Sequence, residues 1–242
     1  MSDAVGTIVQ ALHNDMDTMR TLAQNIANSE TTGYRRAVPV MHSFAALVTG
    51  ELAAVPSATP GAPSVHEATD LSIGPLRQVS GALNLALEGE GYFVVDTDQG
   101  EALTRRGDLK IDAAGFLSTQ SGHRLLGRNG AMHLESGVLN VSPDGIVSAD
   151  DKVLDTLRLV RVDRQAALEP MGADLYRPAD PAAVHDAPGT LVRQGFLEGS
   201  NVQAVNEMTR AVETLRHFEA TERYFRAYDE MTRQAISELG KN

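Results

Sequence analysis

The sequence contains no cysteine and has fewer basic than acidic residues. Without cysteine the chain can form no disulfide, no thiolate metal site and no cysteine nucleophile. The 21 Lys and Arg residues against 32 Asp and Glu residues give a net charge of −11. Proteins that bind nucleic acid usually present a basic stripe to the phosphates. We therefore expect no nucleic-acid partner.

Long hydrophobic runs are also absent from the sequence. No segment approaches the roughly 20 apolar residues that a membrane-spanning helix needs, so we expect no direct membrane insertion. The first residues, Met1-Ser2-Asp3, lack the basic and apolar regions of a signal peptide. We expect that any export of this chain proceeds without a cleaved signal of that kind.

Motifs for catalysis, cofactors and metals are missing in the same way. Gly89 and Gly91 lack the third glycine of a dinucleotide-binding loop. Asp96 and Asp98 imitate part of a calcium loop, but Glu101 stands where its glycine belongs. The seven histidines show no ligand spacing, and no nucleophile elbow occurs. The sequence therefore predicts no catalytic residue, no cofactor and no metal.

A long helix is predicted between Asn201 and Leu239, a stretch without glycine or proline. Ser200 and Gln203 have the spacing of a capping box at its start. Its apolar residues recur at steps of three and four up to Phe218, and the stripe then changes face before Phe225. This shift suggests two different neighbours along the helix, although a single helix lying across a β-domain is an alternative.

A second amphipathic helix is predicted over residues 3–28, at the other end of the chain. The economical arrangement pairs the two helices, apolar stripe against stripe, in a coiled-coil-like core domain that also contacts other copies. We predict that the following residues form this assembly interface: Val5, Ile8, Leu12, Met16, Met19, Leu22, Ile26, Val205, Met208, Val212, Leu215, Phe218 and Phe225.

The region between the helices is predicted to form a connector followed by strands. Residues 36–70 are rich in proline and indicate an irregular arm, or equally a flexible linker. Residues 71–197 show short strands at intervals of roughly ten residues with Gly and Asp turns, which is typical of an all-β meander or sandwich. We expect an α+β protein in which residues 1–35 and 198–242 form the helical core domain and the all-β domain is inserted.

The densest charged cluster of the β region is Arg105, Arg106 and Asp108. We expect these side chains at the surface, where they fix a turn and pair with acids of a neighbouring copy, such as Glu88 or Glu90. An enzyme would instead use the arginines to hold an anionic substrate.

Four ordered segments resemble signatures of the bacterial flagellar axial proteins, the rod and hook family. Residues 23–35 are similar to A-N-N-[IL]-A-N-x-x-T-x-G-[FY]-[KR], and residues 85–95 to L-A-I-x-G-x-G-F-F-V-V. Residues 103–117 are similar to Y-T-R-x-G-x-F…D-x-x-G-x-L, and residues 195–202 to G-x-L-E-x-S-N-V. The motif positions that we single out are Asn25, Asn28, Thr31, Gly33, Tyr34, Gly89, Gly91, Gly107, Glu198, Ser200 and Asn201.

This resemblance implies a structural subunit of the flagellar rod, not an enzyme. Such a subunit polymerises helically through its terminal helices and forms part of the drive shaft and export channel. The implied partners are copies of itself, other rod subunits and the flagellar type III export apparatus. The implied location is the basal body, in the periplasmic space.

Within the family, the chain length and the irregular arm favour a proximal rod subunit. A distal rod subunit or another hook-like axial subunit is the alternative within the family. A β-domain hydrolase or an adhesin with helical tails is the competing class outside it.

Overall fold

The computed structural model describes residues 2–41, 65–134, 137–150, 152–163, 168–172 and 174–239. The chain folds into two compact units. Unit 1 comprises Met1–Ala27, Ala37–Ala68 and Gln203–Asn242, and unit 2 comprises Asn28–Arg36 and Thr69–Val202. A short helix expected at residues 42–48 falls outside the described residues.

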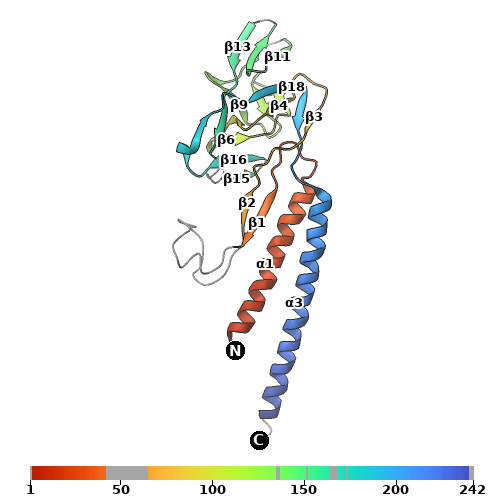
Figure 1. Ribbon diagram of the computed structural model, residues 1–242. Helices are drawn as coiled ribbons and strands as arrows, with labels where there is room; N and C mark the ends of the chain where they lie inside the picture. Colours follow the sequence, from red (N-terminus) through yellow and green to blue (C-terminus); the bar gives the residue numbers. More distant parts are fainter. Residues whose placement is uncertain are drawn as a thin grey trace. The chain divides into compact units, whose positions relative to one another are not determined.

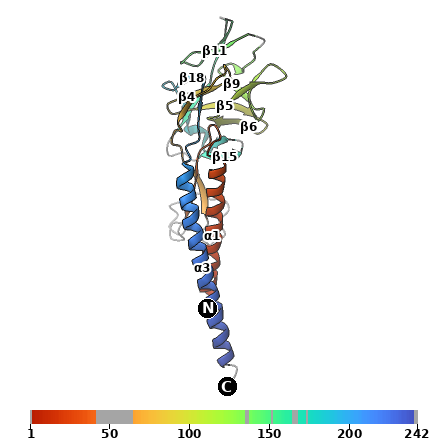
Figure 2. The same ribbon diagram turned by 90° about the vertical axis from the view of Figure 1, so that its right-hand side faces the viewer.

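The described part of unit 1 contains two helices, α1 (Ser2–Ala27) and α3 (Ala204–Leu239), which lie side by side and antiparallel (Figures 1 and 2). His217 Nδ1 of α3 lies 2.7 Å from an Asp15 carboxylate oxygen near the middle of α1. This contact defines the register of the two helices. Because α3 has 36 residues and α1 has 26, α3 continues past the N-terminal end of α1. Strand β1 (Ala37–Met41) pairs with β2 (Val65–Thr69) and also contacts α1. The ends of the expected arm are therefore paired strands.

The side of α3 that is covered within the chain is not the predicted apolar stripe. Reduced exposure recurs at steps of three and four along the small and polar residues Ala204, Glu207, Ala211 and Thr214, and it reaches the predicted stripe at Phe218. The facing helix α1 buries Asn14, Thr21 and Asn25 beside its apolar residues. The expected coiled-coil-like core domain is therefore wrong. The described chain shows two helices with a seam rich in polar and small residues, together with a large region of strands, in a mixed α+β fold.

The predicted start of α3 is also wrong by three residues. The helix begins at Ala204, and the backbone N–H groups of Asn206 and Glu207 donate to the carbonyl of Gln203. The Ser200 hydroxyl oxygen instead accepts a hydrogen bond from the Val202 N–H at 3.1 Å. Ser200 thus stabilises the turn that precedes the helix, which is the alternative use of a serine hydroxyl at such positions.

Unit 2 consists of short strands joined by turns. They are β3 (Leu76–Gln78), β4 (Leu85–Glu88), β5 (Tyr92–Thr97), β6 (Gly100–Thr104), β7 (Leu109–Ile111), β8 (Leu117–Thr119), β9 (Arg124–Gly127), β10 (Gly130–Ala131), β11 (Leu139–Val141), β12 (Ile146–Ala149), β13 (Lys152–Thr156), β14 (Leu159–Val162), β15 (Leu168–Gly172), β16 (Leu175–Pro178), β17 (Val184–Asp186), β18 (Leu191–Gln194) and β19 (Phe196–Glu198). One 3₁₀ turn, Pro181–Ala183, precedes β17.

The largest sheet is antiparallel and has ten strands. Its main path runs β15-β16-β6-β5-β9-β8-β7, with β10 beside β9 and with β14 joining β5 to β17. Smaller sheets are β11-β12-β13, β18-β4 and β19-β3. Strand β5 explains the continuous apolar run in the sequence: Phe93 and Val95 enter one hydrophobic cluster, whereas Tyr92 and Val94 enter another. Both faces of this sheet are covered, so alternation is lost.

The last predicted strand, residues 190–197, is divided in two by Gly195. This glycine has a φ of +78°, in the left-handed region that glycine tolerates best. β18 before it pairs with β4, and β19 after it pairs with β3. The kink delivers the chain to Glu198, on which the next section centres.

Candidate functional site

Glu198, in β19, is the centre of a buried ion cluster in unit 2. Its carboxylate is fully buried, with Arg35 Nη2 2.8 Å from Oε1 and Arg105 Nη1 2.9 Å from Oε2. The Gly74 N–H also donates to Oε1, at 3.0 Å. The cluster thus joins four chain segments that are far apart in sequence. Removing one member would leave a buried charge uncompensated, which is strongly destabilising.

The two arginines share this single carboxylate and also donate to backbone carbonyls. Arg105 donates to Leu87 O at 3.2 Å and to Gly89 O, and Arg35 donates to Ser72 O. The Nε atoms of both arginines lack a hydrogen-bond partner among the described residues. Burial lowers the pKa of Arg105 below its ordinary value, because desolvation disfavours the charged form. With two guanidinium groups around one carboxylate, the cluster carries an excess of positive charge.

Aromatic rings line one side of the cluster. The Arg105 guanidinium lies 5.5 Å from the centroid of the Tyr92 ring, where the ring quadrupole attracts a cation. Tyr92 in turn meets Tyr176 edge to face, with centroids 6.4 Å apart. Burial raises the pKa of both phenols, so both stay neutral near pH 7. The rings contribute no negative charge to offset the arginines.

Two motif asparagines form side-chain hydrogen bonds with the backbone of other chain segments. In unit 1, Asn25 accepts from the Ala37 N–H at 2.9 Å and donates to the Ala37 carbonyl at 2.7 Å. Its amide also donates to the buried Glu207 carboxylate at 3.0 Å. In unit 2, Asn201 accepts from the Arg36 N–H at 2.7 Å. A side-chain amide offers a donor and an acceptor in the geometry of a peptide group, which explains asparagine at both positions.

Motif glycines stand where the backbone approaches other chain segments. Gly33 has a φ of +71°, and a Cβ atom there would lie 2.8 Å from the backbone nitrogen of Arg106. A Cβ atom on Gly107 would lie 1.7 Å from the Leu85 carbonyl oxygen. Gly89 has a φ of +110°, and a Cβ on Gly91 would meet the Thr190 hydroxyl at 3.0 Å. These glycines are therefore explained by packing and backbone geometry.

The remaining motif residues shape the turns beside the cluster. The Thr31 hydroxyl donates to the Asn28 side chain at 3.1 Å, and the Thr31 N–H donates to the Asn28 carbonyl. Tyr34 and Ser200 are buried. All the motif positions thus lie in turns, in side-chain-to-backbone hydrogen bonds or in closely packed contacts.

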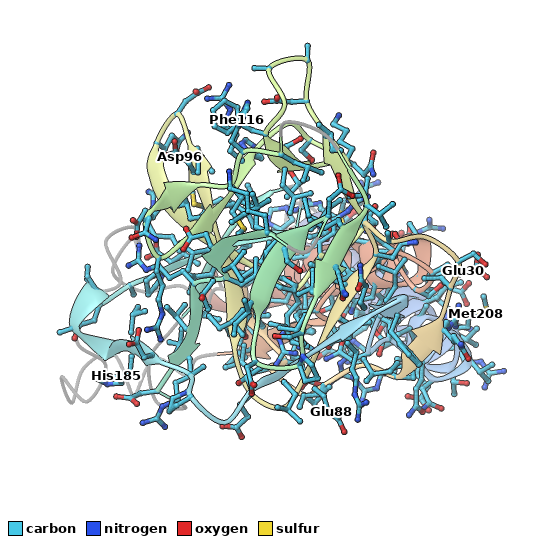
Figure 3. All side chains as sticks on the ribbon, turned by 90° about the horizontal axis from the view of Figure 1, so that it is seen from above. Glu30, Glu88, Asp96, Phe116, His185 and Met208 are labelled. Carbon is cyan, nitrogen blue, oxygen red and sulfur yellow. The ribbon has the colours of Figure 1, made fainter. Side chains whose placement is uncertain are left out.

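Our expectation for Arg105 and Arg106 is wrong. Arg105 is 2% exposed and pairs inside its own chain. Arg106 lies 2.7 Å from Asp108 and 3.1 Å from Asp174. Glu88, the partner we expected from a neighbouring copy, pairs with Arg193 at 2.6 Å and, like His185, lies on the outside of unit 2 (Figure 3). Sequence reasoning did not single out Gly74, and it gave Arg35 no role beyond its match to the family motif. Arg105 directly follows β6, whose last three residues are buried.

The predicted assembly residues divide into covered and exposed groups. On α3, Val205, Met208, Val212 and Leu215 lie on one face and are 75%, 52%, 49% and 44% exposed. We name these four residues the α3 stripe. On α1, Met16 is also exposed, whereas Ile8 and Leu22 are buried. The half-buried positions are Val5, Leu12, Met19, Ile26, Phe218 and Phe225.

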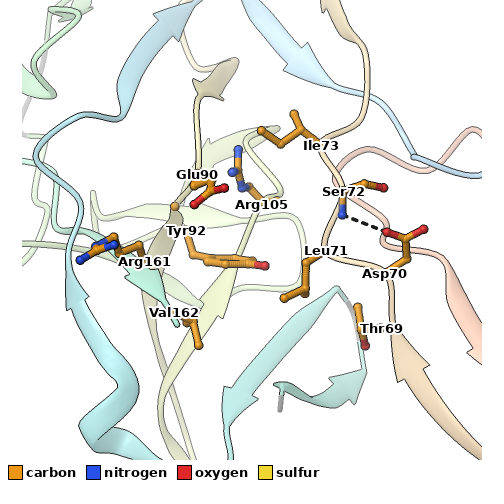
Figure 4. Close-up of a pocket in the computed structure, with 11 residues that line it drawn as sticks. Thr69, Asp70, Leu71, Ser72, Ile73, Glu90, Tyr92, Arg105, Arg161 and Val162 are labelled. Atoms are coloured by element: carbon orange, nitrogen blue, oxygen red, sulfur yellow. Dashed lines mark hydrogen bonds between the residues drawn. The ribbon is translucent and has the colours of Figure 1, made fainter. Parts of the chain in front are cut away.

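Unit 2 also contains a pocket of about 690 Å³. Its lining includes Leu71, Ile73, Tyr92, Arg105 and Arg161 (Figure 4). Among the described residues, no group of three His, Cys, Asp or Glu side chains is placed to hold a metal ion. No described helix combines the length and apolar character required to cross a membrane.

Two family models match separate parts of the chain. A model described as "Flagellar basal body rod FlgEFG protein C-terminal" matches residues 193–238, from β18 into α3. A model described as "Flagellar hook protein FlgE/F/G D1 domain" matches residues 86–149, which include β5 and Arg105.

Curated relatives align with nearly the whole chain. The flagellar basal-body rod protein FlgF of Caulobacter vibrioides is 31% identical over 229 residues, which is 91% of each chain. FlgF of Rhizobium meliloti is 30% identical, over 92% of this chain and 91% of its own. The flagellar basal-body rod protein FlgG of Bacillus subtilis is 25% identical, over 95% of this chain and 96% of its own.

Proposed function

The chain belongs to the family of flagellar basal-body rod proteins, and from this membership we propose that it is a FlgF-type structural subunit of the rod. The observation that carries the proposal is the alignment with FlgF proteins over about nine-tenths of both chains. FlgG proteins align over a similar share at lower identity, so a distal rod subunit is the second candidate. Locating the chain along purified basal bodies by electron microscopy separates the two.

The proposed assembly surface is the α3 stripe. Val205, Met208, Val212 and Leu215 remain exposed after α1 has packed against α3. Burying one such side chain contributes roughly 1.5–3 kcal/mol. Contacts with other copies and with other rod subunits would cover them. When two different surfaces of the same subunit bind each other and the rotation between neighbouring copies does not close a ring, the copies form a helical filament.

In this proposal the two parts of the chain have different tasks. Residues 1–35 and 198–242 assemble, residues 71–197 form a β-domain, and residues 36–70 connect them. The chain performs no catalysis, reaches the periplasmic part of the basal body through the flagellar type III export apparatus, and needs no cofactor. Two findings support this division of tasks: the family membership of the chain, and the names of its relatives, which describe basal-body rod proteins.

The variant Leu215→Asp tests this proposal. A carboxylate buried without a partner costs several kcal/mol, so we expect loss of rods and motility in a deletion strain that carries this variant. Export and the melting temperature of the purified chain should be unchanged, because Leu215 is 44% exposed there. Leu215→Met keeps an apolar side chain and is the matched control. Normal motility with Leu215→Asp would remove the α3 stripe from the assembly surface.

A further inference from the structure

The pocket in unit 2 combines an apolar wall with a cationic floor. Leu71 and Ile73 come from the segment after β2, and Tyr92 and Arg105 come from the central sheet (Figure 4). Tyr92 and Arg105 are buried, whereas Ile73 is 46% exposed at the rim. A side chain that enters this pocket would therefore meet aliphatic groups first and a guanidinium beneath them.

The acids around the pocket already have partners. Asp70 accepts from the Ser72 N–H at 3.0 Å and lies 3.6 Å from Arg36. Glu90 is also engaged in an interaction. Glu198, behind the pocket, serves both Arg35 and Arg105. Asp70 and Glu198 therefore already hold cations of their own.

Two cations of the pocket have incomplete partners. The Arg105 Nε is buried and has no hydrogen-bond partner among the described residues. Arg161, in β14 at the rim, is exposed and makes no ion pair with any part of the chain that the structure describes. Because fixed positive charge lined by low-dielectric walls attracts anions, the pocket favours an acidic group.

We propose that this pocket receives an aspartate or glutamate side chain of a neighbouring copy of this chain, held by Arg161 and Arg105. The inference rests on the proposed rod function, because only an assembly presents a neighbour. Each copy carries 32 Asp and Glu residues whose carboxylates could enter the pocket. Complementary charge of this kind fixes the register of a contact more than it raises affinity. The α3 stripe supplies apolar area, and the pocket selects how copies align.

The test compares Arg161→Glu with Arg128→Glu, a matched reversal at another exposed arginine of unit 2. Both variants should export normally and melt within about 2 °C of the wild type, because exposed substitutions change stability little. We expect Arg161→Glu to yield roughly tenfold fewer complete rods, since juxtaposed like charges weaken a contact by more than 1.4 kcal/mol. Arg128→Glu should assemble as the wild type does.

A photo-crosslinking residue at position 73 identifies the occupant directly. We expect a crosslink to another copy of the chain, at a peptide that contains Asp or Glu. A crosslink only to a different protein, or none in assembled rods, would overturn the proposal. If Arg161→Glu misfolds, the crosslink decides, with Arg161→Gln replacing it in the assembly assay.

The rod function itself is judged separately by Leu215→Asp. If that variant fails to assemble while Arg161→Glu matches Arg128→Glu, the pocket proposal alone is wrong. If Leu215→Asp assembles normally, the proposed assembly surface is wrong, whatever Arg161→Glu does.

Discussion

Unit 1 and unit 2 of this chain treat their polar and apolar residues in opposite ways. Unit 2 buries Phe93, Leu125 and Val147 in its core and pairs its buried charges internally around Glu198. Unit 1 covers Glu207 and Thr214 on α3 but leaves Met208 and Leu215 exposed. Unit 2 therefore pairs the Glu198 carboxylate with cations of its own, whereas the exposed apolar stripe of unit 1 implies a partner from another molecule.

The buried polar groups of the two units differ in the same sense. In unit 2, Glu198 holds two arginines, and its loss would leave their charges unpaired. In unit 1, the buried Glu207 carboxylate accepts a hydrogen bond from the neutral amide of Asn25 at 3.0 Å, and the exposed Arg210 guanidinium lies 3.9 Å from it. An ion cluster tolerates little rearrangement, so we expect unit 2 to be the more rigid unit and the one that sets the overall melting temperature.

The largest effect that would break this contrast is expected from Glu198→Gln. The substitution keeps the shape of the side chain but leaves two buried guanidinium groups without a counter-charge, at a cost of roughly 3–5 kcal/mol. Chemical denaturation followed by near-ultraviolet circular dichroism measures the loss. Glu88→Gln is the control, because the Glu88–Arg193 pair is about half exposed and contributes only about 0–1 kcal/mol. Equal effects of the two variants would show that the cluster does not stabilise unit 2.

A pair of glycine substitutions sharpens the comparison further. Gly107→Ala, in unit 2, would drive a Cβ atom to 1.7 Å from the Leu85 carbonyl oxygen, and overpacking costs typically 1–3 kcal/mol or more. Gly6→Ala, in α1, meets nothing within 4 Å and should raise helix stability by about 0.5–1 kcal/mol. Thermal unfolding followed at a helix wavelength measures Gly6→Ala, and near-ultraviolet circular dichroism measures Gly107→Ala. A stabilising Gly107→Ala would contradict the close backbone contact.

The smallest expected effect is on the pH dependence of stability, to which the Asp70 carboxylate contributes. Burial alone would raise the pKa of Asp70, but hydrogen bonds from Ser72 and the charge of Arg36 lower the pKa below its usual value. A lowered folded pKa contributes stability above the unfolded pKa, and this contribution disappears as the pH falls through the folded value. We expect Asp70→Asn to lose up to about 1 kcal/mol near pH 7 and nothing once the pH is well below 4. Melting curves across that range measure the difference, and Asp96→Asn at an exposed strand end is the control.

The sequence predicted the helices and most strands because local patterns determine them. Apolar steps of three and four gave α1 and α3, and the aromatic and β-branched run gave β5. What those patterns could not predict is which face of α3 is covered inside the chain. Periodic spacing shows that a face is apolar, whereas α1 in fact packs on the face with Ala211 and Thr214.

The ion cluster could not be predicted from the sequence for a related reason. Charged residues are rarely fully buried, so Arg105 was expected at the surface. Its burial depends on Glu198, which lies 93 positions away in the sequence and also pairs with Arg35 from the segment between α1 and β1. Only the folded sheet brings them together. The motif glycines were recognised, but their cause, close contacts such as Gly107 with Leu85, is visible only in three dimensions.

Protection of a single cysteine on the α3 stripe tests the central claim most directly. Because the chain contains no cysteine, Met208→Cys introduces one labelling site on the α3 stripe, and Asp98→Cys introduces one at an exposed turn of unit 2. Both cysteines should react with a maleimide in the free chain. In isolated basal bodies, we predict that position 208 is protected while position 98 still reacts. Equal reactivity of position 208 in the free and assembled chain would contradict the account.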